Sequence, residues 1–332
     1  MNPFSLKGKK ILVLTHKGAD VDAMSASSIL YLLFKKSNFV EIAVPEHLNK
    51  TAEKLAEQME IPFTMKPDFS MFDTLLIADL NSYSMLGNLA REARDFKGKK
   101  FLFDHHTKSG ESIEADYCEC VESAASTTEV LWNEMKKHSI KPNEKIALLT
   151  ACGLITDSAG FSFVSRDSFK VMAEALELTE KNFRDIRELF SVEVEFSERL
   201  ARLKAARKSR LYRIGDFVVV TSEIGAFESQ SASALVGIAA DAAFVAMKSK
   251  GIVRVSGRAR FKFVEVFGLD LARDIFQPLN EFFEGEGGGH VTAAAFTGKA
   301  KSGQVVLDKC MDLLLEKLHE KKQRGLEFKE YK

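Results

Sequence analysis

The sequence predicts an α/β protein in which a first domain, built on a mainly parallel sheet with helices on both faces, precedes a helical linker and a smaller α/β domain. Three observations support this fold class. From residue 9 to about residue 180, short aliphatic runs alternate with patterns of helical period. After residue 215, a second series of strands and a helix begins. The 332 residues are also about twice the length of a common domain.

The first domain contains three aliphatic runs that are typical of buried strands, each followed by a helical pattern. The expected strands cover residues 11–15, 74–78 and 100–103. The expected helices cover residues 23–36, 82–94, 126–138, 142–156 and 167–178, with Asp167 as the N-cap of the last, and a further helix opens at Thr179. The alternation of strands and helices predicts β-α units around a parallel sheet.

The second half begins with a basic stretch, residues 199–213, which carries seven basic residues and no acidic one and predicts a connecting helix. Strands are then expected at 217–221, 243–247 and 252–260, with a helix at 231–240. The mixed-charge tail after Glu316 is expected to be a solvated helix end. The predicted domains are therefore 1–185 (catalytic), 186–211 (basic helical linker) and 212–332 (substrate-binding).

Composition narrows the class of protein. Lys+Arg and Asp+Glu both number 47, so the formal net charge is zero, which argues against a histone-like protein that binds long nucleic acid non-specifically. The chain shows neither a secretory signal nor a membrane span, and a cytoplasmic location without membrane contact is expected. The four cysteines form no CxxC pair, so reduced, partly buried thiols are predicted.

Acidic and imidazole side chains follow the ends of the three predicted strands. In open α/β sheets, ligands bind in the crevice beyond the carboxyl ends of the strands. These side chains are therefore expected to converge there. Two histidines and four carboxylates suit divalent cations such as Mn²⁺ or Mg²⁺, and they suffice for two cations if Asp79 bridges them. The six residues are His16, Asp20, Asp22, Asp79, His105 and Asp157.

These motifs resemble those of the DHH phosphoesterase superfamily. The resemblance rests on Asp104-His105-His106 and on the segments 15–23, 77–79 and 153–157. Segments 254–258 and 285–296 are similar to the substrate-binding domain that is associated with this superfamily. Length and domain arrangement look most like the nano-RNase and phosphoadenosine-phosphate phosphatase branch, which is related to RecJ-type exonucleases. Two positions where the family usually has glycine are Val21 and Ala295.

The resemblance implies a role for each matching residue. One Mn²⁺, for which Mg²⁺ is the alternative, would be held by His16, Asp20 and Asp79. A second would be held by Asp22, Asp79, His105 and Asp157. Asp104 would support the site from behind, and His106 would face the scissile phosphate.

The second domain offers a candidate phosphate-binding surface. Alternate positions of the predicted strand present Arg254, Ser256, Arg258, Arg260 and Lys262 on one face. Val253, Val255, Ala259 and Phe261 are expected to face a core. The glycine run Gly287, Gly288 and Gly289, followed by His290, would let backbone N–H groups approach a phosphate. The predicted substrate-binding residues are Arg258, Ser256, Gly287, Gly288, Gly289 and His290, of which Arg258 and His290 would hold the terminal phosphate.

The sequence thus predicts a two-metal hydrolase that cleaves short single-stranded oligonucleotides to mononucleotides. The same site would also suit a 3′-phosphoadenosine 5′-phosphate phosphatase or a cyclic-dinucleotide phosphodiesterase acting on small nucleotides. A non-catalytic nucleotide-binding regulatory module is the alternative of another class. The sequence leaves cleavage polarity, RNA or DNA preference and assembly as a homodimer open.

Overall fold

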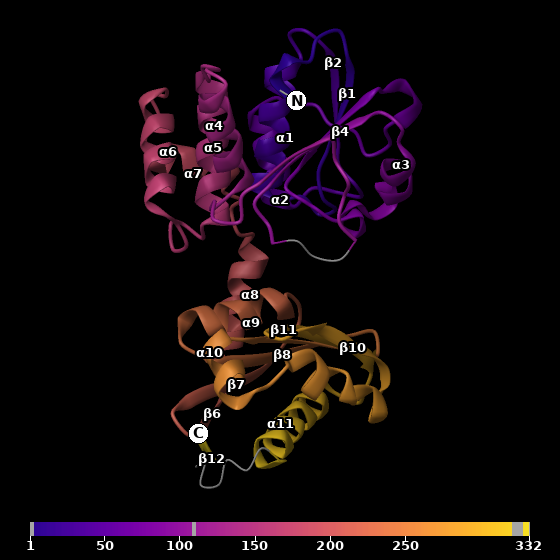
Figure 1. Ribbon diagram of the computed structural model, residues 1–332. Coiled ribbons are helices and arrows are strands. Elements are labelled where there is room, and N and C mark those ends of the chain that lie inside the picture. The colour runs from indigo at the N-terminus through magenta and orange to yellow at the C-terminus, as the bar shows by residue number, and fades with distance from the viewer. Residues whose placement is uncertain (1–2, 108–110, 321–327, 332) are drawn as a thin grey trace. The chain divides into compact units, whose positions relative to one another are not determined.

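The computed structural model describes residues 3–107, 111–320 and 328–331 (Figure 1). The chain divides into two compact units, Met1–Val192 and Glu193–Lys332. Each unit has its own sheet and its own buried cores. The division falls within the predicted linker, so residues 186–192 belong to the first unit and residues 193–211 to the second.

The first unit contains a five-stranded sheet, and every neighbouring pair of strands is parallel, as predicted. The spatial order is β2-β1-β3-β4-β5, so three of the five strands lie inside the sheet. The two outer strands, β2 and β5, are additional to the three that the sequence predicts. The strands are β1 (Lys10–Leu14), β2 (Phe39–Ala43), β3 (Thr74–Ala78), β4 (Lys99–Asp104) and β5 (Tyr117–Cys120).

Helices cover both faces of this sheet, which confirms that part of the prediction (Figure 1). One face packs through Phe101 and Phe103 against the longer helices, including α1, α4 and α5. The other face packs through Leu75 and Ile77 against the short helices that follow β3. The α-helices are α1 (Val21–Phe34), α2 (Lys50–Gln58), α3 (Ala90–Asp95), α4 (Thr127–Lys137), α5 (Glu144–Asp157), α6 (Arg166–Glu177) and α7 (Phe183–Phe190). The short helical turns are η1 (Pro3–Ser5), η2 (Phe69–Met71) and η3 (Tyr83–Leu89).

Three helix starts differ from the prediction. The helix expected at 82–94 is broken at Gly87, whose φ of +51° no helical residue adopts, so the turn η3 precedes the short helix α3. The N-cap of α6 is Ser165 and not Asp167, because Ser165 and Ser168 form a reciprocal capping box. Helix α7 begins after Asn182, which caps it in the same way, and not at Thr179.

The second unit contains a seven-stranded sheet of order β10-β11-β9-β8-β7-β6-β12. The pair β7 and β8 is parallel, with helix α9 between them in the chain, and the other neighbours are antiparallel. The strands are β6 (Arg210–Ile214), β7 (Phe217–Ile224), β8 (Ala242–Ser249), β9 (Ile252–Ala259), β10 (Glu284–His290), β11 (Ala293–Lys299) and β12 (Phe328–Tyr331). Its helical segments are α8 (Phe196–Arg207), α9 (Glu228–Ile238), α10 (Phe261–Phe267), η4 (Leu271–Phe276), η5 (Pro278–Glu281) and α11 (Gly303–Glu320).

The prediction that the tail after Glu316 is a helix end is wrong for the last described residues. Helix α11 is followed, beyond residues 321–327, which lie outside the described residues, by strand β12. Strand β12 pairs with β6 and stacks Phe328 on Tyr212. Of the helices in the described ranges, none combines the length and the apolar character that crossing a bilayer requires.

The basic stretch is not one continuous helix. Helix α8 ends at Arg207 and strand β6 begins at Arg210. The helix does not bridge two domains as a solvated rod, because its Ala201 and Ala205 are buried against the second sheet, next to Val220.

The alternation predicted through Lys262 also ends early. Strand β9 stops at Ala259, and Arg260 becomes the N-cap of α10. Phe261, expected in a core, is 68% exposed because it lies in the first turn of that helix. Val253 and Val255 are fully buried, as predicted.

Two cysteines differ from the prediction. Cys118 and Cys120 form a disulfide in β5, whereas reduced thiols were expected. Alternate residues of a strand point to the same face, and the Cα atoms of this pair are 5.9 Å apart, within the range that a disulfide spans. Cys152 and Cys310 are free and buried. Burial raises the pKa of both of these thiols.

Candidate metal centre

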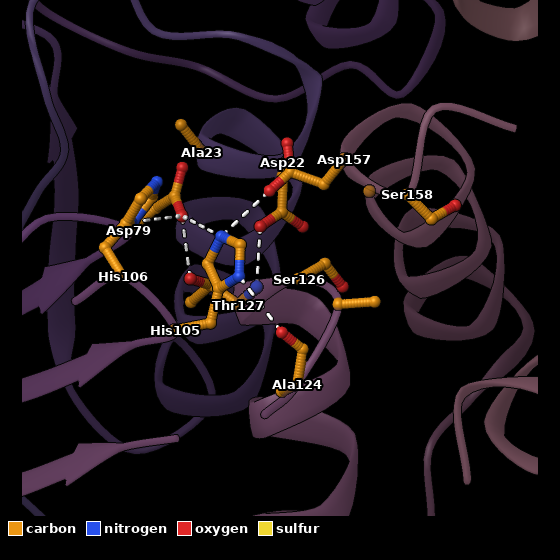
Figure 2. A network of polar contacts seen from close by, with 12 residues as sticks. Asp22, Ala23, Asp79, His105, His106, Ala124, Ser126, Thr127, Asp157 and Ser158 are labelled. Carbon is orange, nitrogen blue, oxygen red and sulfur yellow. Dashed lines mark hydrogen bonds and ion pairs between the residues drawn. The ribbon is translucent and has the colours of Figure 1, made fainter. Parts of the chain in front are cut away.

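Asp79 occupies the centre of a cluster of carboxylates and imidazoles at the end of β3 (Figure 2). Its backbone has a φ of +66°, and its side chain is almost completely buried. The two carboxylate oxygens have different neighbours: Oδ2 lies 3.5 Å from His16 Nε2, and Oδ1 lies 3.6 Å from His105 Nε2. The Thr127 hydroxyl donates a hydrogen bond of 2.7 Å to Oδ1. Asp79 therefore lies between two sets of candidate ligands.

The first set consists of His16, Asp20 and Asp79, each of which offers one donor atom within 4.8 Å of the others. The loop between β1 and α1 supplies His16 and Asp20. The Lys17 carbonyl lies 3.0 Å from His16 Nδ1 and accepts a hydrogen bond from it, so Nε2 is the ring nitrogen that faces Asp79. Asp20 is the N-cap of α1 and accepts a hydrogen bond from the Ala23 N–H. Its second oxygen has no such constraint from the helix.

The second set consists of Asp22, Asp79, His105 and Asp157, whose donor atoms also lie within 4.8 Å of one another. His105 Nδ1 lies 3.2 Å from the Ala124 carbonyl, so Nε2 faces the cluster. Nε2 is 2.8 Å from Asp157 Oδ2, yet it is a buried nitrogen without a hydrogen bond of acceptable geometry. A buried imidazole nitrogen of this kind, facing two carboxylates, fits a divalent cation.

Asp22 is held by the first turn of α4. One carboxylate oxygen accepts the Thr127 N–H at 2.7 Å, and the other accepts the N–H and the hydroxyl of Thr128 at 3.2 and 2.8 Å. The N-terminus of a helix favours an anion because its first N–H groups have no helical partner. Oδ2, which accepts a single hydrogen bond, keeps a second lone pair for a cation. These bonds fix the position of the Asp22 carboxylate, although Thr127 lies 105 residues later in the sequence.

The electrostatics of the cluster call for positive charge. Among the described residues, no Lys or Arg forms an ion pair with any of its four carboxylates. Burial raises the pKa of Asp22 well above its usual range, and the Asp79 and Asp157 carboxylates raise it further. Burial alone would lower the pKa of His16, yet its contact with Asp79 raises that pKa to about 9. The pKa of His105 likewise rises to about 9 beside Asp157, although burial acts against it. All three shifts show that the cluster favours positive charge.

Asp104 and His106 lie beside the cluster, and His106 Nδ1 is 3.7 Å from Asp79 Oδ1. Asp104 is fully buried at the end of β4, and its Oδ1 accepts a hydrogen bond of 2.8 Å from His106 Nδ1. This bond raises the pKa of His106. The amide of Asn81 donates to the other Asp104 oxygen at 2.7 Å and to the His106 carbonyl at 3.1 Å. His106 therefore has a fixed ring orientation while its side chain remains 43% exposed.

The predicted phosphate-binding residues lie on neighbouring strands of the second unit. Strand register aligns Arg258 with Ala293, and Ala293 with His290, so these side chains share a row and a face of the sheet. Adjacent strands are about 4.8 Å apart, which separates the backbones of Arg258 and His290 by roughly 10 Å. The Arg258 guanidinium donates to Ser229 Oγ at 2.7 Å, and its burial lowers the pKa of that group. The next row contains Ser256, Ala295 and Gly288.

The glycine run forms strand β10 at the edge of the sheet. A Cβ on Gly287 would lie 1.8 Å from the Phe276 carbonyl oxygen, and Gly289 has a φ of +144°. Close packing and backbone conformation therefore require these two glycines. A Cβ on Gly288 would meet nothing within 4 Å. Of the three glycines, only Gly288 has room for a side chain, and this room lies on the sheet face that carries Ser256.

The structure brings together the six residues predicted as metal ligands, with Asp104 and His106 beside them. Their role as ligands stays a prediction. Val21, where the family usually has glycine, is the first residue of α1 and is buried in the core. Sequence reasoning missed Asn81, Thr127 and Thr128. The helix predicted from Ser126 was a usable signal for the threonines, because a helix N-terminus attracts a carboxylate.

The chain resembles several known proteins in sequence or in fold. Residues 10–154 match the family described as DHH family, N-terminal domain. An uncharacterized protein of Methanocaldococcus jannaschii is 24% identical over 326 residues, which are 95% of this chain and 96% of that protein. The A-adding tRNA nucleotidyltransferase of Aquifex aeolicus is 26% identical over 182 residues, 54% of this chain and 20% of that enzyme. The structure of an exopolyphosphatase-related protein from Bacteroides fragilis superposes with a TM-score of 0.68 at 16% identity, and it covers 96% of this chain and 93% of its own.

Proposed function

We propose that this chain, whose residues 10–154 match the DHH family, N-terminal domain, hydrolyses short oligonucleotides to mononucleotides with the help of two divalent cations. The observation that carries the proposal is the pair of ligand sets that share Asp79. His16 and Asp20 would complete one set. Asp22, His105 and Asp157 would complete the other. Carboxylate and imidazole donors suit Mn²⁺, with Mg²⁺ as the alternative.

Two cations at such a site lower the pKa of a water molecule and stabilise the attacking and leaving oxygens of a phosphoryl displacement. The chain's own residues supply the remaining functions. His106, held by Asp104 and partly exposed, would donate a hydrogen bond to the substrate phosphate. Arg258 and His290, in one row of the second sheet, would hold the terminal phosphate of the substrate. Recognition of a terminal phosphate would limit the length of the oligonucleotide.

A substrate panel tests the proposal. Full-length protein with Mn²⁺ is assayed on 5′-phosphorylated dinucleotides to pentanucleotides, on 3′-phosphoadenosine 5′-phosphate and on a cyclic dinucleotide. The proposal expects the highest kcat/KM for the short oligonucleotides. A higher value for either small nucleotide would assign the chain to that activity instead. Stoichiometric metal binding without hydrolysis of any substrate would favour a regulatory nucleotide-binding module.

A matched pair of variants ties the activity to the site. Asp79→Asn keeps the size of the side chain but removes the charge shared by both ligand sets, so hydrolysis should be lost. Asp73→Asn makes the same change just before the other end of β3, where Asp73 caps backbone and hydroxyl donors and lies outside the cluster. It should keep full activity. Full activity of Asp79→Asn would contradict the proposed two-metal site.

A further inference from the structure

The second unit contains a basic pocket between the start of α9 and helix α8, both labelled in Figure 1. The cavity has a volume of about 510 Å³, a size typical of small-molecule sites. We propose that this α8–α9 pocket binds a nucleoside phosphate, with its phosphate on the basic side chains of α8 and its base on the apolar wall. The pocket is lined by Ser197, Leu200, Ala201, Lys204, Arg207, Lys208, Ile224, Gly225, Ala226 and Phe227.

The charge of the lining is entirely positive. Arg207 and the C-cap Lys208 lie three and four residues after Lys204, so both neighbour Lys204 at the end of α8. Like charges at this spacing destabilise a helix. Within the described ranges, none of the three forms an ion pair with a carboxylate, and no acidic residue lines the pocket. By contrast, Arg202 on the same helix pairs with Glu198. An anion in the pocket would relieve the repulsion among the three cations.

The loop that closes the pocket lies where parallel strands place their ligands. Ile224 to Phe227 connect the carboxyl end of β7 to α9, and α9 returns the chain to the parallel strand β8. In α/β units, anions bind at this junction, because the helix that follows starts with free N–H groups. Helix α9 has 11 residues, and its N-cap, Phe227, makes no side-chain hydrogen bond to the first turn. Glu228 in the first turn pairs with Arg254 and does not line the pocket, so the uncapped N–H groups and the cations of α8 are independent features that favour an anion.

The remaining wall of the pocket is apolar. Leu200 is 38% exposed, Ile224 is buried, and the Phe227 ring is half-buried. An apolar wall beside three cations suits a ligand that carries both a phosphate and a planar base, because bases stack on apolar and aromatic side chains. Inorganic phosphate alone would leave this wall unused. A nucleoside phosphate matches both halves of the pocket.

The pocket shares no lining residue with the predicted phosphate-binding row, although Arg258 of that row donates to Ser229, two residues after the lining residue Phe227. None of Ser256, Arg258, Gly288 and His290 lines it. The inference therefore goes beyond the proposed hydrolysis and does not depend on it. Either a free mononucleotide or the end of an oligonucleotide would present this chemistry.

Equilibrium binding to the full-length chain tests the proposal. Titration calorimetry is carried out with 5′-AMP, adenosine and inorganic phosphate, with EDTA present so that neither hydrolysis nor metal-bound phosphate contributes. The variant Lys204→Gln/Arg207→Gln should weaken one 5′-AMP binding step by tenfold or more, since a hydrogen bond to a charged group contributes about 1.5–3 kcal/mol and 1.4 kcal/mol is tenfold in Kd. Adenosine and inorganic phosphate should each bind more weakly than 5′-AMP.

The matched control is Arg199→Gln/Arg210→Gln, which removes two charges from the same basic stretch at positions outside the pocket lining. It should leave 5′-AMP binding unchanged. Unaltered binding by the pocket variant, or an equal loss in the control, would overturn the proposal, as would phosphate binding as tightly as 5′-AMP. A 5′-phosphorylated dinucleotide distinguishes the two sources: tighter binding than 5′-AMP, lost in the pocket variant, assigns the pocket to an oligonucleotide end, and equal binding assigns it to a mononucleotide.

Discussion

The side-chain amide of Asn81 donates a hydrogen bond of 2.7 Å to the buried carboxylate of Asp104. Asp104 holds His106 with its other oxygen, so Asn81 acts on His106 through Asp104. Asn81 is itself buried and also donates directly to the His106 carbonyl at 3.1 Å. The orientation of the exposed imidazole therefore depends on a residue that the sequence motifs did not single out.

Asn81→Ala should lower kcat by about 10- to 100-fold, the usual cost of removing a residue that orients a metal-site side chain. KM should change less, because no predicted substrate contact is removed. The control is Asn38→Ala, which removes two similar amide-to-carbonyl hydrogen bonds in the same unit, far from His106 in the sequence. Equal activity losses in both variants would show that instability, and not the position of His106, is responsible.

Gly153 leaves room for the second ligand set. A Cβ at this position would lie 2.2 Å from Asp22 Oδ1 and 2.5 Å from the Thr128 hydroxyl. Gly153→Ala should displace Asp22 and destabilise the first unit by roughly 1–3 kcal/mol, as overpacking does. Elemental analysis should show the bound Mn²⁺ falling from two equivalents toward one.

Gly237→Ala is the matched control for this change. Gly237 also lies in a helix, but a Cβ there would meet nothing within 4 Å. Alanine should stabilise α9 by up to about 1 kcal/mol and leave the Mn²⁺ content unchanged. Retention of two equivalents of Mn²⁺ in Gly153→Ala would contradict the assignment of Asp22 as a ligand.

The placement of the cluster could be predicted because it follows from local patterns and one topological rule. His16, Asp79 and Asp104 each follow an aliphatic run, and parallel strands gather such residues at one edge of the sheet. The predicted helices 126–138 and 142–156 differ from α4 and α5 by at most two residues at each end. Strong periodicity and capping residues define these helices without reference to the rest of the chain.

The features that were missed depend on contacts distant in sequence. The helix start at Ser126 signals free N–H groups, but nothing near Thr127 indicates that the carboxylate they bind lies 105 residues earlier. The packing role of the glycine run also depends on a distant contact, because the Phe276 carbonyl that excludes a Cβ at Gly287 belongs to another element. The alternation through Lys262 predicted a longer strand, but Arg260 donates its side-chain hydrogen bonds to carbonyls of residues 236 and 240 and starts a helix.

Glu174 should make the stability of the first unit depend on pH. Burial raises the pKa of its carboxyl, but hydrogen bonds from Lys136 and Trp132 outweigh that effect and hold the pKa below its usual value of 4.5. A lowered pKa stabilises the folded state above pH 4.5, and this contribution is lost as the pH falls through the folded-state pKa. Because the side chain is 38% exposed, the contribution at pH 7 should not exceed about 1 kcal/mol.

The comparison of wild type with Glu174→Gln measures this effect. Urea unfolding is followed by the fluorescence of Trp132, the single tryptophan of the chain, which reports on the first unit. The variant should be less stable at pH 7, and the difference should shrink below pH 4.5. Glu177→Gln, an exposed change on the same helix, should show no such trend. A difference that persists at pH 3 would mean that the charge of Glu174 is not its source.

Substitution by alanine should destabilise the second unit at Gly287 but not at Gly288. Gly287→Ala places a methyl group 1.8 Å from the Phe276 carbonyl oxygen, so the edge strand must move, and the second unit should lose roughly 1–3 kcal/mol of stability. Gly288→Ala adds a methyl group in open space on the face of Ser256 and Arg258, so stability should stay within about 0.5 kcal/mol. Its KM for a 5′-phosphorylated dinucleotide should rise if a phosphate lies on that face. Calorimetric unfolding and steady-state kinetics separate the two effects, and equal destabilisation by both variants would contradict the packing role assigned to Gly287.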